Sequence, residues 1–564
     1  MVKPFNRILT IGIMLFLFLF AACAGESEKK ESTNTIEVAK YQKQMEKASS
    51  TPFGKYPELI TYTLGKLSGS NNSNLPTGDT YEDNAYTRFL VDFLNVQNQN
   101  VFEKMDNQYD SNVSMAISSG KIPDIMTVSS QEDLRLLVKY DMIADLTDSF
   151  ENCMSDTIRE IYNSYDKDML DAVTFDGKIR AIPETNIEDG PNLVWLRKDW
   201  MEKLGMSDPK NLEDVEYIVS QFMSKNPGGN AAGQTVGLVC DPKLSAGIGF
   251  SNEYMLDLVF ASFGAFPKQW IADENKNAVY GSTTPEAREA LIHINKMYRS
   301  GILDNQFLLR TSSNIIELIT NGQCGSFFGP WWAPNNPLMQ AIKNDPDANW
   351  MPYLIATDDN GSTGYYSKKP TYKYVVVRKE FEHPEIACKI ISALFDYARY
   401  EEKDNKEFGK YYQDNVDPTA RPIAINVDYS NALSLCYTQI SAALNGQCSP
   451  KTLNLLEYSY YETCSAYLKN KSKATPEEWA AYTSRITACK LLSQGKLHKV
   501  KSLFYKETDT MVSEWWKLEE LEEQVYLQIV TGDLPISAFD DFVNRWKSEG
   551  GDIITQEVRE ELSK

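Results

Sequence analysis

Segments with strand composition alternate with segments of helical periodicity along most of this 564-residue chain. The run "LITYTL" (residues 59–64) is rich in β-branched and aromatic residues, and "DNAYTRFLVDFL" (83–94) then places its apolar residues at helical spacing. "DIMTV" (124–128) predicts the next short strand, and another helical pattern follows it. Because strands that alternate with helices usually pair through helical crossovers, the sequence predicts an α/β fold with parallel sheets covered by helices.

Two later helices carry clear start and stop signals. One begins at the predicted cap Asn211 and stops at Pro227, and the other begins at Thr284, with Pro285 in its first turn, and stops at Gly301. The apolar residues predicted to face the core are Leu212, Val215, Val219 and Phe222 in the first helix, and Leu291, Ile294 and Met297 in the second. Both helices are therefore expected to cover a sheet.

The chain is longer than a single domain usually is, and 42% of its residues are hydrophobic, which is ample for more than one core. It contains no internal repeat, and no change in composition divides it cleanly. The sequence therefore predicts two lobes that are connected by several chain crossings rather than by one linker.

The first 23 residues have the features of an export signal. Lys3 and Arg7 give a basic start, residues 8–20 are almost wholly apolar, and Ala-Ala precedes Cys23. The apolar run is short for a spanning helix, which needs about 20 residues. Cys23 after two small residues resembles the lipobox of bacterial lipoproteins, which implies a diacylglycerol anchor on this cysteine. The alternative is an ordinary signal peptide with an accidental cysteine. Residues 24–50 are polar and charged, which favours a flexible tether between membrane and lobes.

Charge and cysteine content exclude several classes of function. A net charge of −21 makes nucleic acid an unsuitable partner and disfavours a polyanionic ligand, unless a local basic patch overrides it. Eight cysteines follow Cys23 without any C-x-x-C pair, so zinc-finger spacing is absent. An exported chain can form disulfides, but one of this size does not need them, so buried free thiols are at least as well supported.

No motif for catalysis or cofactor binding is found. The phosphate-binding loop, the H-E-x-x-H zinc motif and the G-x-S-x-G nucleophile motif are all absent, and the three histidines are far apart in the sequence. "DENKNA" (273–278) resembles the start of a calcium loop, but Ala278 replaces the turn glycine, which favours a β-turn. The acidic residues still allow a carboxylate pair for glycoside hydrolysis, although no pair stands out. We expect no catalytic residue, metal or cofactor.

Several long segments are similar to one protein family. "SGKIPDIMTVSSQEDLRLLVKYDMIADLTDSF" (119–150), "GKIRAIPETN" (177–186), "LVWLRKDWMEKLGMSDPKNLEDV" (193–215) and the ending "IVTGDLPISAFDDFVNRWKSEGGDIITQEVREEL" (529–562) occur in the order expected for that family. They resemble extracellular solute-binding lipoproteins of bacterial ATP-binding-cassette (ABC) sugar importers, in the long form of Gram-positive bacteria. Residues 401–500 carry the least of this resemblance.

The resemblance implies a two-lobed, Venus-flytrap-like α/β fold in which an oligosaccharide binds in the interlobe cleft. It also implies a monomer on the extracellular face of the membrane that docks on ABC-transporter permease subunits. The expected ranges are a signal peptide at 1–22, a lipid-anchored flexible tether at 23–55, lobe 1 at 56–188 plus about 372–425, lobe 2 at 189–371 plus about 426–515, and a C-terminal helical segment at 516–564.

The segments 250–266 and 317–337 are similar to the corresponding parts of maltodextrin-binding proteins. By that resemblance Trp331 is the stacking platform for a sugar ring, with Glu253 and Tyr254 meeting the ligand nearby. The other candidate contacts from these two segments are Asn252 and Trp332.

A physical argument also supports Trp331. A strand delivers the chain into Gly329-Pro330, which exposes the following side chains at a sheet end, and flat sugar rings need an aromatic face with polar groups around it. The alternative is that Trp331 and Trp332 cap the core. Trp195, Trp200, Trp515 and Trp516 lie in regular elements and are predicted to be core residues.

Further candidates lie at the expected crossings and in one loop. Glu184, Thr185 and Asn186 follow the first expected crossing, where they either contact ligand or satisfy turns, and residues 371–380 form the second crossing as a buried strand. Tyr365, beside Tyr366 in a glycine-rich stretch, either lines the cleft or lies on a mobile loop.

The sequence thus favours a lipid-anchored oligosaccharide-binding protein without enzymatic activity. The alternatives are an exported glycoside hydrolase and a peptide-binding lipoprotein.

Overall fold

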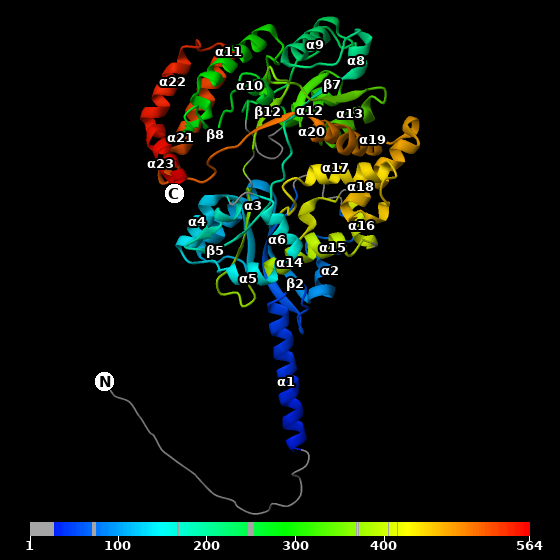
Figure 1. Cartoon of the computed structure of the whole chain (residues 1–564), viewed down its shortest axis with the longest axis vertical. Coiled ribbons are helices and arrows are strands. Elements are labelled where there is room, and N and C mark those ends of the chain that lie inside the picture. The colour runs from blue at the N-terminus through cyan, green and yellow to red at the C-terminus, as the bar shows by residue number, and fades with distance from the viewer. Residues whose placement is uncertain are drawn as a thin grey trace, which may run out of the picture.

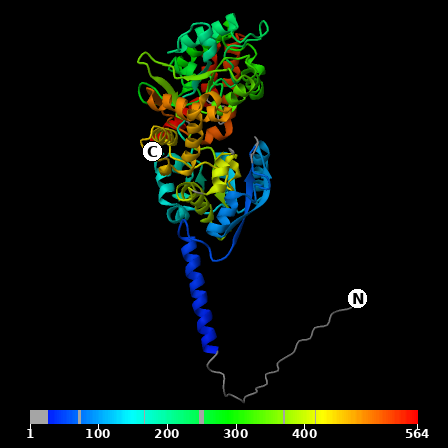
Figure 2. The same ribbon diagram turned by 90° about the vertical axis from the view of Figure 1, so that its right-hand side faces the viewer.

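The computed structural model describes residues 27–69, 75–165, 168–245, 253–367, 369, 371–403, 405–413 and 416–563. They form two lobes stacked along the long axis of the molecule, and helix α1 (Ser27–Ser49) projects from the lower lobe (Figure 1, Figure 2). Each lobe has its own central sheet and its own hydrophobic core. The predicted two-lobed α/β fold is confirmed.

Lobe 1, the lower lobe in Figure 1, is built on a five-stranded sheet with the order β2-β1-β3-β13-β6. The strands are β1 (Ile60–Leu67), β2 (Val96–Lys104), β3 (Ile125–Val128), β6 (Ile182–Pro183) and β13 (Tyr374–Val377). Strand β1 pairs in parallel with β2 and β3, whereas β13 pairs in antiparallel fashion with β3 and β6. All residues of β3 and β13 are buried, as their continuous apolar runs predict.

Helices cover this sheet and supply the core of lobe 1. They are α2 (Ala85–Leu94), α3 (Asp106–Ser119), α4 (Gln131–Lys139), α5 (Thr147–Cys153), α6 (Asp156–Asn163), α7 (Asp168–Asp171), α14 (Ile386–Ser392), α15 (Ala398–Tyr400) and α16 (Lys406–Gln413). The core joins residues from both ends of the lobe 1 sequence, such as Leu90 of α2 and Ile390 of α14. The core of lobe 1 is therefore complete only with the segment that follows lobe 2 in the sequence.

Lobe 2, the upper lobe, contains a three-stranded sheet with the order β10-β7-β11. Its strands are β7 (Leu193–Arg197), β10 (Ser326–Gly329) and β11 (Trp350–Tyr353), and both pairings are antiparallel. The expectation of parallel sheets is therefore wrong for this lobe. Alternation along the chain identifies strands and helices, but it does not fix the direction in which a strand enters its sheet.

The helices of lobe 2 come from two separate parts of the chain. They are α8 (Lys198–Lys203), α9 (Leu212–Lys225), α10 (Asp257–Ala261), α11 (Pro285–Ser300), α12 (Ser312–Thr320), α13 (Met339–Asn344), α19 (Pro476–Tyr482), α20 (Cys489–Gln494), α21 (Asp509–Thr531), α22 (Ala538–Trp546) and α23 (Asp552–Ser563). Helix α21 packs against α11, and the last three helices contribute to the core of this lobe. The expected C-terminal helical segment thus packs into the core of lobe 2.

The local predictions for the helices hold. Asn211 and Thr284 accept backbone hydrogen bonds at the starts of α9 and α11, and Gly301 ends α11 in the left-handed conformation. The seven apolar residues predicted for these two helices are buried. Trp195 and Trp200 are core residues and Trp515 packs against the core, but the prediction for Trp516 is wrong, because its position on α21 leaves it 59% exposed.

Three further strand pairs are short. They are β4 (Thr174–Phe175) with β5 (Lys178–Ile179), β8 (Trp270–Ala272) with β9 (Ala278–Tyr280), and β12 (Thr363–Tyr366) with β14 (Leu497–Val500). A turn joins β8 to β9, where the backbone N–H of Lys276 donates to the carbonyl of Asp273 over 2.9 Å. The "DENKNA" segment thus forms the predicted β-turn.

Three chain segments run side by side where the lobes meet. The backbone N–H of Glu184 donates to Lys373, and that of Thr185 donates to Asn426, each over 2.8 Å. Helices α17 (Ala432–Leu444) and α18 (Leu455–Lys469) add a further connection, because α18 packs against α15 and α16 of lobe 1 and against α19 of lobe 2. The lobes are joined by several crossings, as predicted.

Helix α1 occupies most of the range where the sequence predicts a flexible tether. Its end is fixed to lobe 1 by Lys389, whose buried ammonium donates to the carbonyls of Ala48, Thr51 and Gly54 at 2.6–2.9 Å. A polar segment can therefore be helical without a core of its own when its last turn is bound by another element. Within the described residues, no helix combines the length and apolar character needed to cross a membrane.

Candidate functional site

A cavity of about 230 Å³ lies where lobe 1, lobe 2 and the helices α17 and α18 meet. Its lining residues include Trp331 of lobe 2, Tyr86 and Tyr411 of lobe 1, and Tyr460 of α18. The volume is slightly below the range of about 300–1,000 Å³ that is usual for ligand pockets, and movement of the lobes would change it. This interlobe cavity brings together aromatic faces and polar groups from distant parts of the sequence.

Trp331 is placed at the cavity by the end of strand β10. The indole N–H of Trp195 donates to the carbonyls of both Gly329 and Pro330 over 3.2 Å, which fixes the turn before Trp331. A Cβ atom on Gly329 would come within 2.7 Å of the Phe327 ring, so a side chain would disturb this turn. The predicted strand into Gly-Pro is thus present, and Trp331 after it lines the interlobe cavity.

Trp331 itself is less open than a free stacking platform. Only 6% of its surface is exposed, and its indole N–H donates to Asp189 over 3.0 Å. The guanidinium of Arg485 lies over its ring at 4.4 Å. Its role in stacking a sugar thus stays a prediction. Trp332 packs against the hydrophobic core that contains Trp331, and its side chain is partly exposed.

Three arginines line the interlobe cavity, and sequence reasoning singled out none of them. Arg485 lies between the rings of Trp331 and Tyr460, and Arg421 lies over the ring of Phe395 at 4.8 Å. Arg399 is 9% exposed and pairs with Asp428 over 2.9 Å. Arg421 and Arg485 belong to the part of the chain where the family resemblance is weakest, Arg399 lies just before it, and no short motif marks any of the three.

Glu184 lies in the crossing region rather than in the cavity lining. Its carboxylate accepts from the ammonium of Lys373 over 3.2 Å and from the backbone N–H of Asn426 over 3.1 Å. Burial raises the pKa of Glu184, and Lys373 acts in the opposite direction. Asn186 donates through its side-chain amide to the carbonyl of Lys369 over 2.9 Å. Both residues thus bind other chain segments at the hinge, and their contact with ligand stays a prediction.

Glu253 and Tyr254 lie deep in lobe 2, close to the end of β10. The backbone N–H of Tyr254 donates to Phe328 over 2.9 Å, and its ring packs in the same core as Trp331. Glu253 is 2% exposed, and one of its carboxylate oxygens has no hydrogen-bond partner among the described residues. Burial raises the pKa of Glu253 to about 8. Asn252 and Cys23, the remaining candidates, lie outside the described residues.

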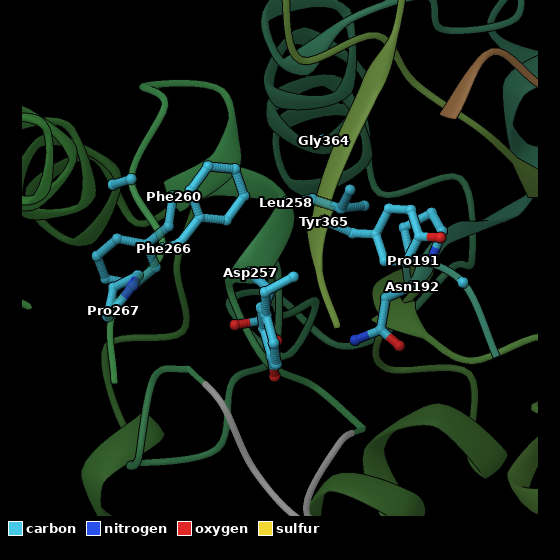
Figure 3. A pocket seen from close by; sticks show the side chains of 12 residues that line it. Pro191, Asn192, Asp257, Leu258, Phe260, Phe266, Pro267, Gly364 and Tyr365 are labelled. Atoms are coloured by element: carbon cyan, nitrogen blue, oxygen red, sulfur yellow. The ribbon is translucent and has the colours of Figure 1, made fainter. Parts of the chain in front are cut away.

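Tyr365 lines a second, smaller pocket of about 40 Å³ (Figure 3). It belongs to strand β12 rather than to a mobile loop, because Tyr365 pairs with Lys499 of β14. Asn192, Asp257 and Phe266 are among the other lining residues. This pocket is far below the usual size of a ligand site.

No group of three or more histidine, cysteine or acidic side chains suited to a metal ion occurs in the described part of the chain. The eight cysteines after Cys23 are all free thiols, and seven of them are buried. Apart from the thiol of Cys436, the polar side chains that line the interlobe cavity carry guanidinium, phenol, amide and carboxylate groups, which suit ligand binding by hydrogen bonds and charge.

Comparison with known proteins gives a consistent picture. No protein-family model matches the sequence. The chain is 21% identical over 468 residues to Lipoprotein LipO of Bacillus subtilis, and this alignment covers 80% of this chain and 84% of that protein. It is also 21% identical over 463 residues to the polygalacturonan/rhamnogalacturonan-binding protein YtcQ of the same species, over 80% of this chain and 82% of that protein.

Solved structures share the fold at low sequence identity. The alginate-binding protein AlgQ2 aligns with a TM-score of 0.60 and 13% identity, over 91% of this chain and 99% of that one. The ABC-transporter substrate-binding protein FusA of Streptococcus pneumoniae, in complex with kestose, aligns with a TM-score of 0.59 and 13% identity, over 89% and 99% of the two chains. This chain thus has the two-lobed fold of solute-binding proteins, as the sequence resemblance implies.

Proposed function

We propose that this chain is the substrate-binding protein of an ABC importer, that it captures an oligosaccharide, and that it acts as a monomer on the outer face of the cell membrane. The observation that carries this proposal is the interlobe cavity, where the rings of Trp331, Tyr86 and Tyr460 come together with polar side chains from both lobes. Aromatic faces with polar groups around them suit sugar rings, and lobe closure would enclose the ligand.

The known proteins support the same assignment. Three of the four proteins named above, YtcQ, AlgQ2 and FusA, are binding proteins by name, and each of their descriptions specifies a saccharide. By analogy, the lipid on Cys23 anchors the chain, and the closed form delivers its ligand to permease subunits. Glu184 and Asn186 act at the hinge in this proposal, whereas Trp331 contacts the ligand.

Calorimetric titration of a soluble chain from Ala24 to Lys564 tests the proposal. A panel of oligosaccharides is compared with short peptides, and each sugar is checked for cleavage products. We expect saturable binding of at least one oligosaccharide without turnover, and a loss of about tenfold or more in affinity for Trp331→Ala. Trp516→Ala is the matched control, because this tryptophan is exposed on α21. Cleavage of a sugar would support the glycoside hydrolase instead, and binding of peptides alone would support a peptide-binding lipoprotein.

The anchor is tested separately. With the natural signal sequence, Cys23→Ser is expected to release the protein from the membrane fraction into the medium, while the unaltered chain stays with the membrane. Equal release of both forms would contradict lipid attachment.

A further inference from the structure

We propose that the interlobe cavity selects an oligosaccharide that carries carboxylate groups, such as a uronate oligosaccharide. This inference rests on the proposed function and adds the charge of the ligand to it. Three guanidinium groups, those of Arg399, Arg421 and Arg485, line the cavity against the single carboxylate of Asp428. Such a local excess of positive charge contrasts with the net charge of −21 for the whole chain.

The one carboxylate in the lining is already engaged. Asp428 pairs with Arg399 over 2.9 Å, and both side chains are largely buried. The Nε atom of Arg399 is also buried and has no hydrogen-bond partner among the described residues. Arginine stays protonated at any physiological pH, so a side chain that lines the cavity carries a buried donor with no acceptor.

The other two arginines have aromatic partners but no acidic ones. Arg421 lies over the rings of Phe395 and Tyr86, at 4.8 Å and 5.5 Å, and Arg485 lies between Trp331 and Tyr460. Within the described parts of the chain, neither guanidinium forms an ion pair with a carboxylate. Stacking on an aromatic ring covers the face of a guanidinium and leaves its edge, where the N–H groups lie, for a bidentate acceptor.

The backbone of the segment that carries Arg421 is bound to strand β1 of lobe 1. The ammonium of Lys66, on β1, is fully buried and donates to the backbone carbonyls of Thr419, Arg421 and Pro422. This contact binds the segment to the central sheet of lobe 1. The backbone at Arg421 is therefore held in place before a ligand arrives, which lowers the entropy that binding must overcome.

A carboxylate is the ligand group that best matches these donors. Partly buried guanidinium groups lose water contacts, and charge-assisted bonds to a carboxylate would replace them. Hydroxyl groups of a neutral sugar can accept hydrogen bonds, but they leave the positive charge uncompensated.

The test compares acidic oligosaccharides with their methyl esters, which keep the ring and the linkage but remove the charge. The probes are trimers of galacturonate, glucuronate and mannuronate, each beside its fully esterified form, with neutral glucose and fructose oligomers in addition. For at least one pair we expect the acid to bind the unaltered protein about tenfold or more tightly than its ester. This preference should shrink as salt is added, because ions screen charge interactions.

Two variants locate the preference in the cavity. Arg421→Gln and Arg485→Gln are each expected to bring the acid-to-ester ratio of affinities close to one, whereas Arg421→Lys keeps part of it. Arg545→Gln is the control, because Arg545 is exposed on α22 and pairs with Glu549, four residues later in the chain. Thermal unfolding shows whether each variant is folded, and the comparison of acid with ester in the unaltered protein stands without any variant.

The outcomes separate the two proposals. Equal or tighter binding of esters or neutral oligomers would overturn the charge selection and leave oligosaccharide binding intact. An acid preference that persists in both glutamine variants would place the selection elsewhere and overturn the role of this cavity. Failure of every oligosaccharide to bind would overturn both proposals together.

Discussion

The guanidinium of Arg485 lies between two aromatic rings, 4.4 Å from the centroid of Trp331 and 3.9 Å from that of Tyr460. Trp331 follows a strand of lobe 2, whereas Tyr460 belongs to α18, which also packs against lobe 1. The stack thus connects the predicted sugar platform to the helices that bridge the lobes. A ligand that binds here would contact groups from both sides of the hinge.

Removal of one ring should loosen this stack. Tyr460→Ala is expected to lower the free energy of unfolding by about 1–2 kcal/mol, because the cation–π contact and the packing of the ring are lost. Tyr460→Phe keeps the aromatic face and should stay close to the unaltered protein. Urea unfolding measures both variants, and equal stability of the alanine and phenylalanine forms would show that the ring does not support Arg485.

Glu184 should control how the lobes move. Its carboxylate binds Lys373 and the backbone of Asn426, so Glu184→Ala removes contacts between three crossing segments. We expect a loss of about 1–2 kcal/mol in stability and a wider range of lobe arrangements in solution. Small-angle X-ray scattering with and without ligand measures the second effect. Glu274→Ala is the control, since Glu274 lies exposed in the turn before β9, and identical scattering of the two variants would contradict a hinge role.

Glu253 should make stability depend on pH. Its pKa is raised from 4.5 to about 8 by burial, so the folded chain holds a proton there that the unfolded chain releases. The stability from this group is fully present below pH 4.5 and is lost as the pH rises through 8, by up to about 1.4 kcal/mol per pH unit between these values.

Glu253→Gln cannot titrate and should lack this loss. Urea unfolding at pH values from 5 to 9 is expected to show the variant gaining stability relative to the unaltered chain as the pH rises. Glu274→Gln serves as the control for removal of an exposed carboxylate. A constant difference between the Glu253 variant and the unaltered chain across this range would contradict a raised pKa.

Lys389 should hold α1 on lobe 1. Lys389→Met leaves the carbonyls of Ala48, Thr51 and Gly54 without their shared donor, and we expect faster proteolysis near residue 50 together with a loss of about 3 kcal/mol in stability. Lys121→Met, at an exposed position after α3, is the control. Cleavage near residue 50 at the same rate in both variants would show that other contacts fix the helix.

The reactivity of the cysteine thiols should depend on their burial. In the chain from Ala24 to Lys564, which lacks Cys23, only Cys448 of the eight free cysteines is partly exposed, so a thiol reagent is expected to label one group in the native protein and eight in denaturant. Burial raises the pKa of Cys436, in the cavity lining, to about 11, which slows its reaction further. Fewer than eight groups in denaturant without reductant would reveal a disulfide.

The sequence by itself determined the local structure and the place of the turn before Trp331. Asn211 and Thr284 begin their helices as predicted, since capping depends on residues three positions apart. The antiparallel sheet of lobe 2, the exposed Trp516 and the helical α1 differ from prediction, because each depends on contacts with distant elements.

Only the tertiary structure decided which polar groups share the cavity with Trp331. Arg399, Arg421 and Arg485 are each ordinary in their own segments, and no spacing along the chain connects them to Trp331 or Tyr86. They come together because the chain crosses repeatedly between the lobes and because α18 packs against helices of both lobes. Sequence periodicity records neighbours within a few residues, whereas a binding site between lobes is made of contacts across hundreds of residues.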